Sequence, residues 1–101
     1  MYNKYTNKIL QYKNKNIYII FYSPWCKYSI DAINLLKSKG LSFKGYNIDK
    51  IKGEIERLLF YLKQEKDIIK FNENHKTRPI IFHNGKFVGG FTDLELYLKN
   101  H

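Results

Sequence analysis

The sequence predicts an α/β fold in which a four-stranded mixed sheet is flanked by helices, and three observations lead to that class. Some segments carry apolar residues at helical spacing, whereas others are short and β-branched or alternate with period two. The two kinds of segment follow one another in the order α-β-α-β-α-β-β-α. No repeat, low-complexity tract or linker divides the chain, so we expect residues 1–101 to form one domain.

The first half of the chain is predicted to form helix, strand, helix and strand. Tyrosines and an isoleucine at helical spacing predict an amphipathic helix over residues 6–13, and the apolar run at residues 17–22 predicts a central strand covered on both faces. A helical stripe over residues 26–39 ends before Gly40, a residue typical of helix ends. Period-two alternation predicts a second strand over residues 41–48, parallel to the first because a helix connects them.

The second half of the chain is predicted to form two helical segments and a hairpin. One helical stripe covers residues 51–62, and a further short helix is expected over residues 64–71. Strands at residues 80–83 and 86–88 flank Asn84-Gly85, a strong signal for a type I′ hairpin turn.

The last helix is predicted from a capping motif that follows this hairpin. Thr92 and Glu95 have the T-x-x-E spacing of a capping box, in which each side chain bonds the other residue's backbone N–H. We therefore expect a helix that opens at this motif and runs through Leu98.

The charge and hydropathy of the chain limit its partners. There are 18 Lys+Arg against 9 Asp+Glu, a formal net charge of +9, which directs attention to anionic partners. Most aromatic residues fall at core-periodic positions rather than among the lysines, so we expect no nucleic-acid partner. The apolar run at residues 17–22 is far below the roughly 20 residues that cross a bilayer, so we also expect no membrane partner.

The cysteine count excludes further classes of protein. The single cysteine, Cys26, can form neither an intramolecular disulfide nor a multi-cysteine metal site, which excludes disulfide-stapled secreted folds and zinc ribbons. Unpaired thiols are typical of reducing compartments, and the start of the chain has no signal-peptide core, so we expect a cytoplasmic protein with no metal site of its own.

The position of Cys26, at a predicted strand-to-helix junction, suits a nucleophile. Unpaired N–H groups and the helix dipole stabilise a thiolate there, and Lys27 adds a positive charge. Ser29 lies one turn further on and can donate its hydroxyl to the thiolate, but it cannot resolve a mixed disulfide. These residues alone leave the alternative that Cys26 is a buried small hydrophobe.

Four features, in order along most of the chain, resemble the glutaredoxin family of the thioredoxin-fold superfamily. They are a strand leading into C-x-Y-S (residues 26–29), Thr77-Arg78-Pro79 about fifty residues later, the hairpin turn Asn84-Gly85, and Gly89-Gly90-Phe91-Thr92-Asp93. The resemblance implies a thioredoxin-like fold and a single-cysteine, C-x-x-S member of the family.

The resemblance also implies how glutathione is bound. The bond between Arg78 and Pro79 would be cis, Pro79 would face the cysteine, and the Arg78 backbone would pair with glutathione. Gly90 would allow close approach of backbone to ligand. The amides of Thr92 and Asp93 would hold the γ-glutamyl carboxylate, and the Asp93 side chain would pair with the α-amino group.

The sequence departs from the family at the cation beside the site. Members commonly have a lysine three residues before the cysteine, and this chain has Ser23 there. Lys76, just before Thr77, matches a position that is often basic, while Lys27 and Arg57 are looser candidates. Tyr28 matches the motif tyrosine that lines the glutathione site.

The resemblance implies an enzyme that reduces protein–glutathione mixed disulfides by the monothiol route, because only Cys26 is present. Its partners would be glutathione and glutathionylated proteins, and we expect a monomer. The alternative is a dimeric carrier in which Cys26 of each subunit and two glutathiones hold a [2Fe–2S] cluster. A third class, a redox-inert binding module, requires an unreactive Cys26.

The three histidines, His75, His83 and His101, have no ligand-like spacing. We expect all three at the surface, with His75 nearest the cysteine.

Overall fold

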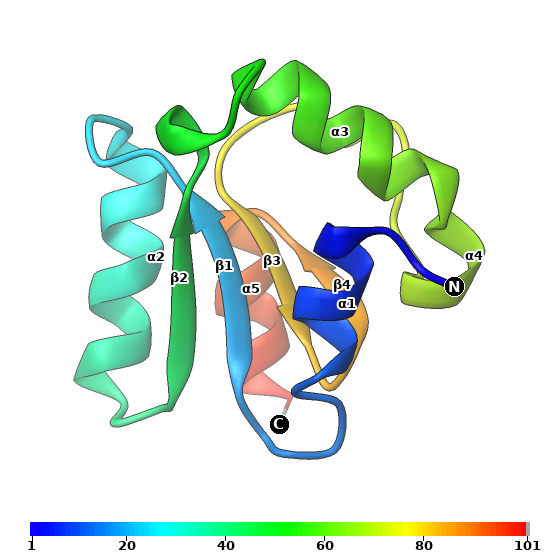
Figure 1. The fold of residues 1–101 in the computed structure, drawn as a ribbon. Helices are drawn as coiled ribbons and strands as arrows, with labels where there is room; N and C mark the ends of the chain where they lie inside the picture. The colour runs from blue at the N-terminus through cyan, green and yellow to red at the C-terminus, as the bar shows by residue number, and fades with distance from the viewer. Residues whose placement is uncertain (101) are drawn as a thin grey trace.

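A mixed β-sheet in the strand order β2-β1-β3-β4 forms the middle layer of the computed structural model, which describes residues 1–100 (Figure 1). The central strand β1 (Tyr18–Tyr22) pairs in parallel with β2 (Phe43–Asn47). On its other side it pairs antiparallel with β3 (Ile80–His83), which pairs antiparallel with β4 (Lys86–Gly89). The sheet confirms the predicted strand directions.

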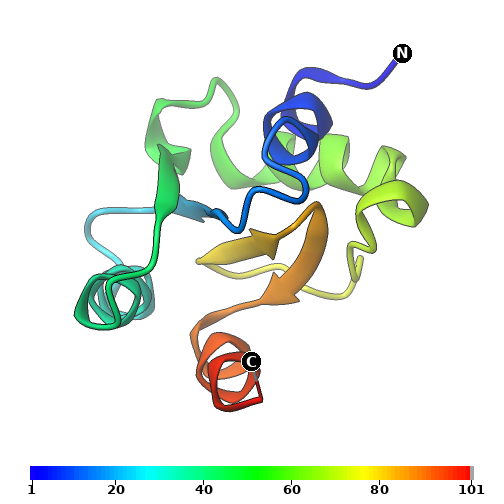
Figure 2. The ribbon, with the colours of Figure 1, turned by 90° about the horizontal axis from the view of Figure 1, so that it is seen from below.

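Helices cover both faces of this sheet. They are α1 (Lys4–Leu10), α2 (Lys27–Ser38), the short 3-10 helix η1 (Ile48–Lys50), α3 (Glu54–Gln64), α4 (Lys66–Ile69) and α5 (Phe91–Lys99). Figure 2 shows α1, α3 and α4 on one face and α2 and α5 on the other. The predicted α/β class is confirmed, and within the described residues no helix is long and apolar enough to span a membrane.

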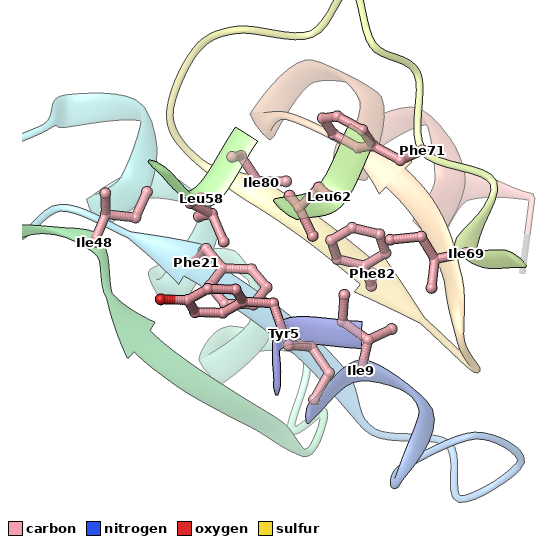
Figure 3. Close-up of a cluster of buried hydrophobic side chains, with 11 residues drawn as sticks. Tyr5, Ile9, Phe21, Ile48, Leu58, Leu62, Ile69, Phe71, Ile80 and Phe82 are labelled. Carbon is pink, nitrogen blue, oxygen red and sulfur yellow. The ribbon is translucent and has the colours of Figure 1, made fainter. Parts of the chain in front are cut away.

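Alternation along β1 divides the core into two clusters. Ile19 and Phe21 face α1, α3 and α4, in the cluster drawn in Figure 3, whereas Tyr18 and Ile20 face α2 and α5. Because both faces of β1 are buried, the strand is held rigidly. The residues that follow it, which include the cysteine, therefore start from a fixed point.

The first helix begins and ends earlier than the predicted residues 6–13. The side chain of Asn3 accepts hydrogen bonds from the backbone N–H groups of Tyr5 (3.1 Å) and Thr6 (3.0 Å), so Asn3 is the N-cap. The helix ends at Leu10 and is followed by turns. The apolar spacing identified the helix, but the cap sets its first residue.

The predicted capping box at Thr92 and Glu95 is wrong. Gly90 is the N-cap of α5, and the Asp93 carboxylate accepts a hydrogen bond from its backbone N–H at 2.9 Å. Thr92 and Glu95 both lie inside the helix, which runs to Lys99. Among the described residues, the only side chain that bonds the cap is therefore that of Asp93, a residue predicted to bind glutathione.

The hairpin turn has the predicted conformation. Asn84 and Gly85 both have positive φ, 52° and 81°, as a type I′ turn requires.

The expectation that all histidines lie at the surface is wrong for His83, which is 8% exposed; His101 lies outside the described residues. The His83 ring stacks on Tyr18 with centroids 3.9 Å apart. Its Nε2 donates to Asn16 Oδ1 at 2.8 Å, and its Nδ1 accepts from the Tyr97 hydroxyl at 2.7 Å. The ring is buried because both of its nitrogens are satisfied.

Candidate active site

The cysteine lies where the central strand passes into α2. Cys26 is the N-cap residue of α2, with φ −87° and ψ 122°, and its backbone N–H donates to the Ser23 carbonyl at 3.1 Å. Its side chain is partly exposed, which removes the alternative of a buried hydrophobe. Among the described residues no side chain caps α2, so the positive end of the helix dipole faces the sulfur.

The loop that carries the motif proline crosses in front of the cysteine. The Arg78–Pro79 peptide bond is cis, as the resemblance implied. The Sγ of Cys26 lies 4.0 Å from the backbone oxygen of Arg78, so this loop brings its backbone against the thiol. Pro79 itself is buried at the start of β3.

Ser29, the residue predicted to donate to the thiolate, is fully buried. Its hydroxyl oxygen accepts a hydrogen bond from the Ser23 backbone N–H at 3.2 Å. A hydroxyl that accepts one bond can still donate its own proton. Donation from Ser29 to Cys26 therefore stays a prediction.

Arg78 is held beside the cysteine by a chain of polar contacts. Its Nε donates to Ser23 Oγ at 2.7 Å, and that hydroxyl donates to Asp49 Oδ1 at 2.9 Å. The other carboxylate oxygen of Asp49 accepts from Trp25 Nε1 at 2.7 Å. The guanidinium lies over the Trp25 ring, 4.9 Å from its centroid. Four residues from three separate segments thus fix one cation near the thiol.

A cavity of about 310 Å³ opens between the proline loop and the start of α5. Its lining brings together six of the predicted glutathione residues and adds two others: Tyr28, Thr77, Arg78, Gly90, Thr92, Asp93, His75 and Phe91. Segments about fifty and about sixty-five residues beyond the cysteine motif thus meet in one site. The volume is at the lower end of the range typical of small-molecule sites.

Five of the predicted site residues do not line this cavity: Cys26, Lys27, Ser29, Lys76 and Pro79. Lys27 is directed along α2, where its ammonium pairs with Asp31 at 2.7 Å, and the hydrogen bond that it donates to that carboxylate raises the pKa of Lys27. The side chain of Lys76 is exposed. The binding roles predicted for these two lysines stay predictions.

The wall formed by the start of α5 depends on a glycine. Gly89 has φ +132°, and a Cβ on it would collide with the Asp93 carboxylate. Because that carboxylate already bonds Gly90, it is held at the helix N-terminus next to the amides of Thr92 and Asp93. These amides suit an anion, while the carboxylate suits a cationic amino group.

His75 is a cavity residue that the prediction did not include in the site. Its Nε2 donates to the Pro79 carbonyl at 3.1 Å, and its ring packs edge-on against Phe87, with centroids 5.2 Å apart. The only signal in the sequence was its proximity to Thr77. Phe91 belongs to the predicted glycine-rich motif but had no role assigned to it. Asp49 gave no signal at all, because its role arises from contacts across the fold.

Among residues 1–100, no three His, Cys, Asp or Glu side chains are grouped closely enough to hold a metal ion.

The chain is similar in sequence to a known protein family and to individual proteins within it. The Glutaredoxin family model matches residues 18–88. A probable glutaredoxin of Acanthamoeba polyphaga mimivirus is 47% identical over 81 residues, which are 80% of this chain and 76% of that protein. The mitochondrial glutaredoxin-2 of Bos taurus is 31% identical over 87 residues, which are 86% of this chain but only 50% of that protein.

Solved structures show the same fold. A dithiolic glutaredoxin of Trypanosoma brucei brucei has a TM-score of 0.73 and 28% identity, covering 97% of this chain and 89% of that one. A buckwheat glutaredoxin in complex with glutathione has a TM-score of 0.71 and 20% identity, covering 94% of this chain and 79% of that one.

Proposed function

The chain belongs to the glutaredoxin family and has the thiol oxidoreductase role of that family, and from this premise we propose that it reduces protein–glutathione mixed disulfides by a monothiol mechanism. The observation that carries the proposal is the position of its single cysteine. Cys26 lies partly exposed at the start of α2, with the Arg78 backbone against its sulfur. The trypanosomal neighbour is dithiolic, whereas this chain has no second thiol to resolve a disulfide within itself.

The proposed reaction proceeds in two exchanges. The Cys26 thiolate attacks the glutathione sulfur of the mixed disulfide, so that a Cys26–glutathione disulfide forms and the protein leaves as a thiolate that takes up a proton. The thiolate of a second glutathione then attacks the glutathione sulfur on Cys26. Oxidised glutathione leaves and Cys26 is again a thiolate, so that one mixed disulfide and one glutathione thiol have become one protein thiol and one oxidised glutathione.

The cavity beside Cys26 supports a site for the glutathione moiety. We place its γ-glutamyl carboxylate on the amides of Thr92 and Asp93 and its α-amino group on the Asp93 carboxylate. The backbone of Arg78 would pair with the cysteine residue of glutathione, and Tyr28 would line the same site.

Arg78 is our candidate for the cation that replaces the lysine missing at Ser23. Its Nε is bonded to the Ser23 hydroxyl, so the guanidinium lies against the position from which that lysine would start. An arginine suits a carboxylate because its planar group presents several N–H donors. Lys76, which is exposed, stays the alternative.

Replacing the nucleophile tests the proposed reaction. We expect Cys26→Ser to reduce the release of glutathione from a glutathionylated peptide to the background rate, because a serine hydroxyl is not ionised at neutral pH. The wild-type protein should also form one glutathione adduct, at Cys26, that mass spectrometry detects. Turnover that persists in Cys26→Ser would refute the mechanism, and an intact fold in that variant is checked by circular dichroism.

The cluster carrier is tested separately. This chain offers one cysteine ligand, so the other three ligands of a [2Fe–2S] cluster would have to come from glutathione and a second subunit. Anaerobic reconstitution with iron, sulfide and glutathione should leave a colourless monomer if the chain acts only as the enzyme. A brown dimer would favour the carrier. In either role the lone thiol suits a reducing compartment, and we propose the cytoplasm.

A further inference from the structure

A second cavity, of about 560 Å³, lies on the face of the sheet that α1 and α3 cover. We call it the lysine cavity after the four lysines that line it: Lys4, Lys8, Lys50 and Lys52. They come from α1, from η1 and from the turn that follows η1. The cavity shares no lining residue with the one beside Cys26, so it is a separate feature of the molecule.

The lining of the lysine cavity contains four cations and no carboxylate. The other cavities described with two lysines also contain an acid: Lys66 and Lys70 lie with Asp67 and Glu73, and Lys39 and Lys99 with Glu95. Among the described residues, ion pairs form at Lys27, Lys63 and Lys66 but at none of the four lysines of this cavity. Their charge is therefore left for a partner from outside the chain.

Repulsion between two of these lysines lowers the free energy of unfolding. Lys4 and Lys8 are four residues apart on α1, so they lie on the same side of the helix and repel each other. The ammonium of Lys8 lies 4.9 Å from the centroid of the Tyr46 ring, and that of Lys4 lies 5.2 Å from the Tyr5 ring. The rings attract the ammonium groups without neutralising them, so both stay available to an anion.

Aromatic residues give the cavity a firm base. Tyr46 stacks on the buried Phe21 at 5.5 Å, and Tyr5 packs edge-on against the same ring at 6.2 Å. In Figure 3 the Tyr5 hydroxyl points from the core toward β2, the strand that carries Tyr46. Because these rings are anchored in the core, the lysines gather around a preformed hollow rather than a flat surface.

We propose that the lysine cavity binds a small polyphosphate, either free or as part of a nucleotide. Lysine ammonium groups are compact charges that bind phosphate oxygens from several directions. A single carboxylate would engage one or two of the four, whereas a chain of two or three phosphates has the charge to engage all of them. The volume lies within the range of sites for such small molecules.

Inorganic tripolyphosphate is the first probe, because it has the linked phosphates of a nucleotide without the sugar or the base. Titrated into the ¹⁵N-labelled protein, it should shift the amide signals of Tyr46, Asn47 and Lys50 and leave those of Gly90 and Thr92 in place. Shifts centred on Gly90 and Thr92 would overturn the proposal, because the anion would then be bound at the start of α5. ATP and adenosine distinguish the sources: ATP binding tighter than tripolyphosphate identifies a nucleotide, and adenosine alone should not bind.

Two double variants that remove the same charge distinguish binding at the lysine cavity from general attraction of an anion to a basic protein. Lys8→Gln/Lys50→Gln should weaken tripolyphosphate binding by about tenfold or more, because two charges adjacent to the anion are lost. Lys37→Gln/Lys86→Gln removes the same charge from exposed positions that line none of the cavities described and should change the affinity by less than about twofold at physiological salt. Equal losses in the two variants, or no binding to the wild type, would refute the proposal. Single-stranded DNA that binds equally well to both variants and tighter than tripolyphosphate would instead indicate a diffuse nucleic-acid surface.

Discussion

Ser23 and Arg78 are best understood together. Ser23 is fully buried and has no charge to offer a ligand, whereas Arg78 reaches across from the proline loop and donates to its hydroxyl at 2.7 Å. Asp49 accepts from both Ser23 and Trp25, so it sets the direction of the hydrogen bonds. Because the serine proton goes to Asp49, the serine oxygen is free to accept from Arg78. Under the proposed function, Arg78 therefore takes the place of the lysine that family members commonly have three residues before the cysteine.

Replacement of Arg78 tests this interpretation. Arg78→Gln should raise the KM for a glutathionylated peptide by about tenfold with kcat little changed, because a charge-assisted contact to the bound glutathione is lost. Lys76→Gln removes a charge two residues away and should change KM by less than about twofold, since an exposed lysine contributes little. The reverse result, a large effect at Lys76 and none at Arg78, would assign the role to Lys76.

The residues of the candidate site could be predicted from the sequence where they belong to short motifs. The residues of the cysteine motif, the proline loop and the α5 start were identified from short motifs, and six of the predicted glutathione residues line one cavity. The partners of Arg78 could not be predicted in this way. The bonds to Ser23 and from Ser23 to Asp49 join residues 55 and 26 positions apart, and such contacts depend on how the loops meet in three dimensions.

At the scale of elements, the buried strands were the most predictable part of the fold. β1 is apolar throughout and pairs on both sides, so its composition determines both its type and its place. The starts of α1 and α5 were predicted wrongly because they depend on single side chains, Asn3 and Asp93, which bond nearby backbone groups. A pattern of apolar spacing does not contain that information.

Tyr97 links α5 to β3 through the buried His83, and this contact predicts how stability depends on pH. Burial raises the pKa of Tyr97, and burial together with Tyr97 raises the pKa of Tyr18. The folded state therefore keeps these protons at a pH where the unfolded state has lost them. The stabilising contribution is fully present below about pH 10 and is lost as pH rises through the folded-state pKa.

Tyr97→Phe should therefore have two effects on urea unfolding. Near neutral pH it should lower the free energy of unfolding by about 1 to 2 kcal/mol, because the buried His83 loses a hydrogen-bond partner. Above about pH 10 the further fall in stability should be shallower than in the wild type, since one titrating group is gone. Tyr2→Phe, at an exposed position, should show neither effect. An alkaline slope identical to that of the wild type would contradict the argument.

For the whole molecule, the excess of positive charge is the dominant electrostatic feature. The net charge is +9, and three ion pairs are formed among the described residues, two of which share Glu73. The molecule extends 34 × 30 × 21 Å, so most lysines lie within reach of several others when the ionic strength is low. Repulsion among them opposes folding, because the extended chain separates the charges.

Salt should consequently stabilise this protein. Raising NaCl from about 0.05 M to about 0.3 M shortens the screening length from about 14 Å to about 6 Å, which weakens repulsion across the molecule more than attraction within close ion pairs. We expect the midpoint of thermal unfolding to rise with NaCl at neutral pH. Near pH 9.6, the isoelectric point of the sequence, the net charge vanishes and the rise should become much smaller. A midpoint that falls with salt at neutral pH would mean that local ion pairs outweigh the net charge.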